Sequence, residues 1–242
     1  ESDMATITSA QSGYWDDPMT WVGETVPDLS VDDVVVADYH TVTAAGSYLT
    51  LSNGRNITVE ANGVLEIGTQ LTVESGASVY VQGRLHIEDY AQVHVYGAMD
   101  IDSGGGVEVN YYGEHYVENG GMLTVEGYVQ LSYYSLLIVS YVGKLIVGRL
   151  GSVDAYYESS IYFDNYSRSD IFGHFVLAED SYLSIGHESL VRVYYDISVS
   201  GRMVSDGGKI VMMRREGRIN DADGDSLFVF DQAYGNGLTM IT

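Results

Sequence analysis

The fold is decided between Ile57 and Val109, where the chain reads ITVEANGVLEIGTQLTVESGASVYVQGRLHIEDYAQVHVYGAMDIDSGGGVEV. Pairs of aliphatic residues, each pair split by one other residue, recur through this stretch, and turns rich in Gly and polar residues separate them. Such alternation is typical of a strand with one buried face. Successive pairs begin alternately 8 and 6 residues apart, and they are Ile57/Val59, Leu65/Ile67, Leu71/Val73, Val79/Val81, Leu85/Ile87, Val93/Val95, Met99/Ile101 and Val107/Val109.

The resulting sequence period of 14 is compatible with two solenoids. Two pairs per coil give a two-sided coil of 14 residues, and three pairs give a three-faced coil of 20–22 residues. Spacings near 22 later in the chain favour three faces: Val109, Leu131 and Val153 repeat at 22, and adjacent tyrosines stand at 111–112, 133–134 and 156–157. Like residues stack in a solenoid because each coil lies about 4.8 Å from the last. The tyrosines therefore predict an aromatic ladder beside a corner.

The predicted fold class is all-β: a right-handed parallel β-helix, or β-solenoid, of about 20–22 residues per coil with an N-terminal cap. Residues 1–45 are expected to form the cap and the first strands, and residues 46–242 the solenoid, within one continuous structural domain. Two segments interrupt the aliphatic pattern, and the sequence predicts loops there, at residues 110–116 and 164–172.

The charge balance restricts the partners. The 242 residues include 34 acidic and 11 basic side chains, a net charge of −23. A surface of that kind repels phosphate backbones and anionic lipids, so neither nucleic acid nor membrane insertion is expected. The chain has no cysteine, and therefore no disulfide or thiolate site. It begins at Glu1 without a basic and apolar leader, as a secreted protein does after its signal peptide is removed.

The first coil of a solenoid exposes an apolar floor and an unpaired strand edge, which must be covered. Both tryptophans, Trp15 and Trp21, lie within residues 1–45. Their wide rings are expected to lie across the end of the core.

The same segment resembles the eight-glycine domain family and related bacterial surface β-helices, whose sequences read Ser-Gly-x-Trp-x-Asp-Pro-x-Thr-Trp, Val-Pro, Asp-x-Val-x-Ile and Gly-His-Thr-Val. Tyr39 and Glu24 replace glycines of that pattern. The resemblance implies an extracellular protein, often an adhesin or cell-surface module, with no catalytic residue and with a turn or cap hydrogen bond for His40. The matching residues are Ser12, Gly13, Trp15, Asp17, Pro18, Thr20, Trp21, Val26, Pro27, Asp33, Val34, His40, Thr41 and Val42.

Carboxylate pairs could mark a polysaccharide-cleaving site, since such enzymes use them as acid, base or nucleophile. Five acidic residues cluster in the sequence around His115: Asp100, Asp102, Glu108, Glu114 and Glu118. Acidic residues are abundant everywhere, however, and the interleaved Lys and Arg of a polyanion-cleaving groove are missing. The sequence therefore predicts no catalytic residue.

The histidines are interpreted as surface residues. His86 and His94 each stand in the middle of an aliphatic pair, so both are expected to point outward. They lie on consecutive strands, hence on different faces, which argues against a shared metal.

The most ligand-like motif is Asn-Asp-Ala-Asp-Gly-Asp at residues 220–225. Asp221, Asp223 and Asp225 alternate around a glycine turn and can converge on one hard cation, so the motif predicts a calcium site. The alternative is an acidic turn between strands without an ion. The spacing is not that of an EF-hand, because Gly falls at the fourth position and Gln232 at the twelfth.

The C-terminal stretch 238–242 is apolar and strand-like. It could fold back as a lid, precede further protein, or add a strand to a neighbouring subunit, and head-to-tail repetition of that contact makes a filament. The sequence thus predicts a non-catalytic, secreted or cell-surface structural protein that self-associates end to end into a fibre or serves as an adhesin module, with other surface proteins or polysaccharide as further partners. The alternatives are a carbohydrate-binding module that uses the tyrosine ladder and a polysaccharide-active β-helix enzyme.

Overall fold

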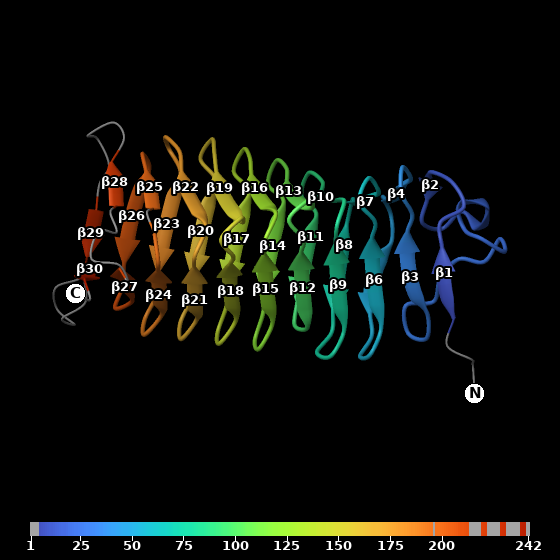
Figure 1. Ribbon diagram of the computed structural model, residues 1–242, viewed down its shortest axis with the longest axis horizontal. Helices are drawn as coiled ribbons and strands as arrows, with labels where there is room; N and C mark the ends of the chain where they lie inside the picture. Colours follow the sequence, from blue (N-terminus) through green and yellow to red (C-terminus); the bar gives the residue numbers. More distant parts are fainter. Residues whose placement is uncertain (1–4, 196, 213–218, 222–227, 231–237, 241–242) are drawn as a thin grey trace.

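The computed structural model describes residues 5–195, 197–212, 219–221, 228–230 and 238–240. The chain winds as a parallel β-helix with three parallel sheets along the molecule (Figure 1), and the first coil contributes a strand to only two of them. The one helical element among the described residues is a single 3-10 turn, η1 (Pro18–Thr20). No helix in this part of the chain is long and apolar enough to cross a membrane.

The strands are short, mostly of four residues, and after the first coil they follow one another from sheet 1 to sheet 2 to sheet 3. Sheet 1 contains β1 (Thr6–Thr8), β3 (Asp33–Val36), β6 (Asn56–Val59), β9 (Ser78–Val81), β12 (Ala98–Ile101), β15 (Met122–Val125), β18 (Lys144–Val147), β21 (Arg168–Ile171), β24 (Leu190–Val193), β27 (Lys209–Met212) and β30 (Leu238–Met240). Sheet 2 contains β2 (Gly13–Tyr14), β4 (Thr41–Ala44), β7 (Val64–Ile67), β10 (Arg84–Ile87), β13 (Gly106–Val109), β16 (Tyr128–Leu131), β19 (Ser152–Ala155), β22 (His174–Leu177), β25 (Ile197–Val199) and β28 (Ile219–Asp221). Sheet 3 contains β5 (Tyr48–Leu51), β8 (Gln70–Val73), β11 (Gln92–Val95), β14 (Glu114–Val117), β17 (Leu136–Val139), β20 (Ser160–Phe163), β23 (Tyr182–Ile185), β26 (Arg202–Ser205) and β29 (Phe228–Phe230).

Strand pairing confirms the three-faced coil and excludes the coil of 14 residues. Ile57 pairs with Val79, 22 positions later, and Leu71 pairs with Val93, again 22 positions later. Coils of other lengths occur between these: Leu65 pairs with Leu85 at a spacing of 20. The turns absorb these differences, so the strands stay in register while the spacing changes.

One alignment taken from the spacing of 22 is wrong. Val109 does pair with Leu131, but Leu131 then pairs with Ala155 rather than Val153. That coil has 24 residues, because its last turn, 148–151, is two residues longer than the corresponding turn 126–127 of the coil before it. Fixed spacing therefore fails wherever one turn gains residues.

In the four-residue strands from β3 to β26 the second and fourth residues point inward, and they belong to one continuous core that is mostly aliphatic. In β11, for example, Val93 and Val95 are fully buried, while Gln92 and His94 are half-buried on the outside. The core runs from Ile7 to Ile210 without interruption. Short strands are stable here because each pairs with the coils above and below it.

The prediction of loops at residues 110–116 and 164–172 is wrong. Both segments contain strands, β14 and β21, that continue sheets 3 and 1. In each strand the first inward position carries a polar residue, His115 or Ser169, and both side chains are fully buried. Because one of the two inward residues is polar, these strands lack the pair of aliphatic residues by which the other strands were recognised in the sequence.

The segment between β2 and β3 lies at the N-terminal end of the solenoid (Figure 1). Trp15 and Trp21 are buried there, with ring centroids 4.9 Å apart at an interplanar angle of 72°. Trp21 Nε1 donates a hydrogen bond to the carbonyl oxygen of Trp15 at 2.8 Å. Burial of both tryptophans in the core is confirmed.

Two non-glycine residues at the start of the chain adopt the left-handed backbone. Glu24 has a φ of 54° and Tyr39 a φ of 62°, the region that favours glycine. Neither residue is a glycine, so each adopts a backbone conformation that L side chains rarely take. Beside Tyr39, His40 Nδ1 lies 2.9 Å from Ser9 Oγ, which confirms a hydrogen bond at this turn.

Candidate functional site

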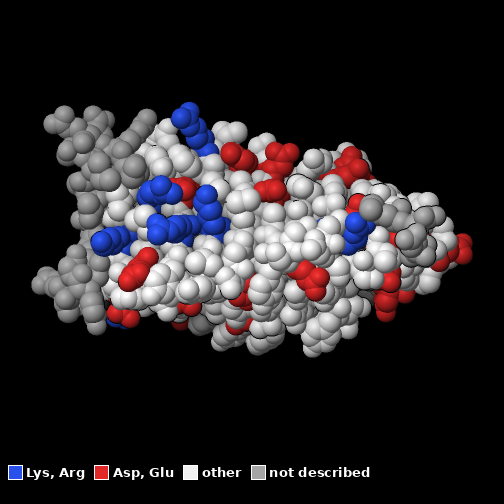
Figure 2. All heavy atoms as spheres, turned by 90° about the horizontal axis from the view of Figure 1, so that it is seen from below, with Lys and Arg blue, Asp and Glu red and all other residues white. Residues whose placement is uncertain are grey.

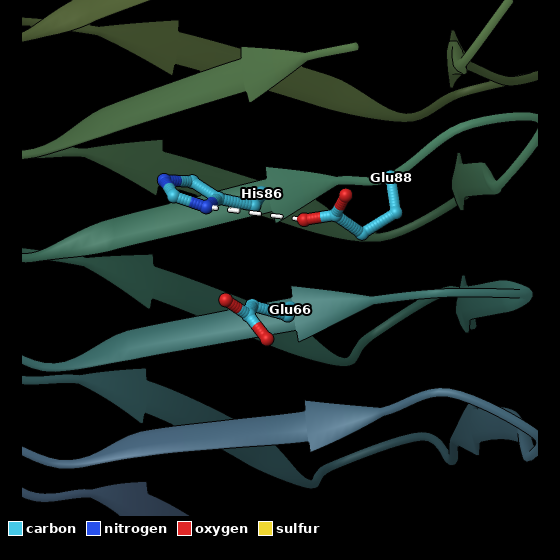
Figure 3. A group of neighbouring side chains, drawn as sticks. All are labelled: Glu66, His86 and Glu88. Atoms are coloured by element: carbon cyan, nitrogen blue, oxygen red, sulfur yellow. Dashed lines mark ion pairs between the residues drawn. The ribbon is translucent and has the colours of Figure 1, made fainter. Parts of the chain in front are cut away.

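The outer face of sheet 2 brings one histidine and three carboxylates together. His86, at the third position of β10, lies in register between Glu66 of β7 and Glu108 of β13. Glu88 follows the end of β10 at the corner toward sheet 3. Figure 3 shows the Glu88 carboxylate turned back toward the imidazole, with Glu66 on the neighbouring strand below it. Three successive coils and one turn therefore build this group.

The two ring nitrogens of His86 face different carboxylates. Nδ1 lies 4.0 Å from Glu88 Oε1, and Nε2 lies 3.2 Å from Glu108 Oε2. The contact at Nε2 falls short of hydrogen-bond geometry, although the atom is shielded from solvent. One donor atom each from Glu66, His86 and Glu88 lies within 4.8 Å of the other two. All three side chains are half-buried, so the group is open to solvent on one side.

Neighbouring side chains hold two of these carboxylates in place. Thr43 Oγ1 donates to Glu66 Oε2 at 2.6 Å, and Tyr128 Oη donates to Glu108 Oε1 at 2.6 Å. Burial, followed by the hydrogen bond to Glu108, raises the pKa of Tyr128 to about 12. The Tyr128 ring lies directly over Gly106, where a Cβ would collide with it. Glycine at this position lets the phenol reach Glu108.

Sequence reasoning missed this cluster. It placed His86 and His94 correctly on different sheets, outside the core, but it assigned neither one a carboxylate partner. Glu66 and Glu108 stand 20 and 22 positions from His86, so no local motif connects them. The coil length could have predicted this contact, because residues one coil apart lie next to each other on neighbouring strands.

The acidic residues that cluster in the sequence around His115 do not meet in space. Asp100 lies on sheet 1, Glu108 on sheet 2 and Glu114 on sheet 3, while Asp102 and Glu118 lie in the two turns between. Eighteen residues span most of one coil, so these side chains point in different directions around the solenoid. Two of the five meet a histidine, each on a different sheet: Glu108 lies beside His86, and Glu118 lies beside His94.

His115 is not a surface residue, so that interpretation is wrong. Its side chain is fully buried on the inner face of β14, and neither ring nitrogen has a hydrogen-bond partner in the described part of the chain. Burial, with a smaller contribution from the charge of His94, lowers the pKa of His115 from 6.5 to about 4. The imidazole is therefore neutral in the folded protein at neutral pH.

The tyrosine ladder is confirmed at the corner between sheets 2 and 3. Tyr90, Tyr112 and Tyr134 stack in successive coils, with centroids 5.3 and 5.1 Å apart and rings within 15° of parallel. Tyr133 and Tyr157 stack at 4.6 Å in a second column. All five have a positive φ. Stacking between coils thus accompanies a backbone conformation that normally favours glycine.

The second column ends beside a shallow hollow of about 580 Å³. Tyrosine rings form one side, and the carboxylates of Glu158, Glu179 and Asp180 lie on the other. Tyr134 Oη donates to Glu158 Oε1 at 3.0 Å, so the ladder continues into these acidic residues. Aromatic faces next to hydrogen-bond acceptors are suited to a ligand with both apolar and hydroxyl surfaces.

Basic side chains gather toward the C-terminal end of the molecule (Figure 2). Lys144 pairs in register with Arg168, and Leu190 separates Arg168 from Lys209 on the outer face of sheet 1. We call Lys144, Arg168 and Lys209 the basic strip. Within the described residues, neither Arg168 nor Lys209 forms an ion pair, whereas Arg192 beside them donates to Asp170 Oδ2 at 2.8 Å.

A hollow of about 480 Å³ lies along the basic strip between Arg168 and Lys209. Both of these side chains are exposed and line it, together with Ser189 and Glu188. The two cations outnumber the single carboxylate of the lining, which favours an anionic ligand or an acidic protein surface.

The predicted calcium residues fall almost wholly outside the described residues. Asp223 and Asp225 are not described, and Asp221 is described only as the last residue of β28. The C-terminal stretch is partly described: β30 pairs with β27 of the same chain and continues sheet 1.

No protein-family model matches the chain, and a search of curated proteins finds no match. Among solved structures, the chain is similar to one described as "Crystal structure of TibC-catalyzed hyper-glycosylated TibA55-350 fragment". The sequence identity is 14%, the alignment covers 100% of this chain and 93% of that chain, and the TM-score is 0.27. At that identity and TM-score we infer nothing about this chain from it.

Proposed function

We propose that the protein is a non-catalytic, extracellular structural and interaction module: a rigid β-solenoid that self-associates end to end at a cell surface or in a fibre. The observation that carries this proposal is the uneven distribution of charge along the rod. Residues 1–143 contain 20 acidic and only two basic side chains, whereas residues 144–242 contain 14 acidic and nine basic ones. Residues 1–45 contain nine acidic side chains and no basic one.

Both halves are net negative, but nine of the eleven basic side chains lie in the C-terminal half, so a head-to-tail contact can place them against carboxylates of the N-terminal coils, whereas a contact between two N-terminal ends brings mainly carboxylates together. The basic strip supplies unpaired cations in the C-terminal half, and the N-terminal coils supply carboxylates. The parallel sheets add a second reason. Every strand in a sheet points the same way, so two copies joined head to tail keep the strand direction, while copies joined head to head reverse it. A head-to-tail contact does not close and generates a filament.

The experiment is light scattering and sedimentation of the full chain over a range of protein concentrations, at low and at high salt. The expected result is a mass that grows with concentration and falls with added salt, since screening weakens exposed charge pairs. Deletion of residues 236–242 tests the contribution of the C-terminal stretch. The double substitution Arg168→Glu with Lys209→Glu should weaken association, and Arg84→Glu, which removes a cation from sheet 2, is the matched control. A strictly monomeric chain under all of these conditions would overturn the proposal.

Carbohydrate binding is the second candidate, supported by the hollow beside Tyr133 and Tyr157. A glycan array tests it directly, and Tyr157→Ala, at a side chain 60% exposed, should reduce any signal. An assay for reducing-end release from acidic polysaccharides covers the enzyme alternative. Release of reducing ends would contradict the non-catalytic part of the proposal.

A further inference from the structure

The cluster around His86 has a chemistry that the proposed structural role does not require. We propose that His86 Nδ1, with one carboxylate oxygen each from Glu66 and Glu88, binds a divalent transition-metal ion such as Zn²⁺ on the outer face of sheet 2. The three side chains come from two adjacent strands and the turn that follows one of them. None of them contributes to the core, so the site is an addition to the fold.

The donor set fits the ion. One imidazole nitrogen and two carboxylates are ligands that Zn²⁺ accepts, and the two negative charges neutralise it. Donor atoms about 2.1 Å from one zinc ion lie about 3.4 Å apart in a tetrahedron. The three atoms here lie within 4.8 Å of one another, so they must close by about an ångström. Glu88 is half-buried at the start of a turn and can make that movement, and water can fill the remaining position.

Glu108 prepares the imidazole for this role. A histidine that binds metal through one nitrogen usually donates its other N–H to a carboxylate, which fixes the tautomer and the ring orientation. Glu108 Oε2 lies 3.2 Å from His86 Nε2, on the side of the ring away from Glu88. A proton on Nε2 leaves the lone pair of Nδ1 available on the side of the ring that faces Glu88. The hydrogen bond from Tyr128 and the packing on Gly106 hold Glu108 in turn.

The choice of a transition metal over calcium follows from the imidazole. Calcium takes six to eight oxygen ligands, whereas imidazole nitrogen suits Zn²⁺ and its neighbours. This separates the His86 site from the oxygen-only motif at Asp221, Asp223 and Asp225. Titration with calcium and with zinc therefore probes different parts of the chain.

The chain offers a matched control in His94. His94 has the same outward position on the next strand of the coil, and its Nδ1 lies 2.8 Å from Glu118 Oε1. Its ring stacks on Tyr116 at 4.6 Å. Among the described residues only Glu66, His86 and Glu88 form a group of three such donors. His94→Ala thus removes a comparable surface histidine and leaves the proposed site intact.

The test is isothermal titration of the full chain with zinc chloride in a buffer that does not bind metal. We expect the wild type and His94→Ala to bind one Zn²⁺ with the same affinity, and His86→Ala to lose that binding. Glu108→Gln should weaken it about tenfold or more, the usual effect of removing a carboxylate behind a metal-bound histidine. Addition of calcium should not displace the zinc.

Circular dichroism checks that each variant keeps its β-rich spectrum. Glu88→Gln, at the start of a turn, provides a second variant if His86→Ala fails to fold, and it should also weaken zinc binding. Zinc binding of equal stoichiometry and affinity in the wild type, His86→Ala and Glu88→Gln would overturn the proposal. So would an equal loss in His94→Ala, because it would show that surface histidines bind zinc non-specifically.

Discussion

His115 lies in register with Leu137 inside the solenoid, so an imidazole occupies a position that a leucine fills in the next coil. Val93 occupies the same position in the previous coil. Both ring nitrogens are buried without a partner among the described residues. Burial of an unpaired polar group costs about 1–3 kcal/mol. This single residue makes an otherwise aliphatic column sensitive to pH.

The first prediction concerns acid stability. The unfolded chain protonates His115 near pH 6.5, whereas the folded chain does so only near pH 4. Between these values the unfolded state binds more protons, so the free energy of unfolding falls as the pH falls. The loss attributable to His115 is about 3 kcal/mol between pH 6.5 and pH 4. Denaturant unfolding at several pH values measures it.

His115→Leu is the matched variant for that experiment, since it supplies the side chain found at Leu137. The variant should be more stable than the wild type at neutral pH, and the extra loss of stability below pH 6.5 should disappear. Identical pH profiles for the two proteins would show that other groups are responsible for the acid sensitivity.

The second prediction tests the strand register. Val95 is fully buried in β11, and Val95→Asp would place a carboxylate in the aliphatic column. We expect this variant not to fold, because no partner is available for the charge. His94→Asp on the outside should keep the fold, with a modest loss because the new carboxylate faces Glu118, where His94 now makes a hydrogen bond. Equal melting temperatures for the two variants would contradict the register.

The third prediction separates stacking from backbone strain in the tyrosine ladder. Tyr112 stacks between Tyr90 and Tyr134 at a φ of 55°. Tyr112→Ala loses the stacking and keeps the strain, whereas Tyr112→Gly loses both. Tyr112→Gly should therefore be about 1 kcal/mol more stable than Tyr112→Ala, as measured by thermal unfolding. A less stable glycine variant would mean that the left-handed backbone is not strained here.

The fourth prediction concerns calcium at Asp221, Asp223 and Asp225. Calorimetric titration of the wild type with millimolar calcium should give binding heat, and Asp223→Ala should abolish it, because each carboxylate supplies oxygen ligands to the ion. His86→Ala should leave the calcium heat unchanged. If the wild type gives no binding heat, the calcium prediction is wrong and the motif is an acidic turn that binds no ion.

The sequence alone determined the fold class, the inward and outward faces of most strands, and the tyrosine ladder. These follow from local patterning: a strand with one buried face must alternate apolar and outward residues, whatever the neighbouring coils do. The burial of Val93 beside the outward His94 is one such case. The same logic failed at β14 and β21, where His115 and Ser169 replace aliphatic residues at inward positions. A core stabilised by many neighbouring residues tolerates one polar side chain. The alternation of apolar and polar residues cannot reveal that such a side chain points inward.

Only the tertiary structure decided which side chains meet across coils. Glu66 and His86 stand 20 positions apart, His86 and Glu108 stand 22 apart, and Leu131 and Ala155 stand 24 apart, yet each pair lies in register. The spacing between stacked residues is the summed length of three strands and three turns, and each turn can change length without disturbing the sheets. A one-residue error in that sum moves a side chain from one face of the strand to the other. The metal-binding cluster at His86 therefore depends on coil lengths that only the folded chain defines.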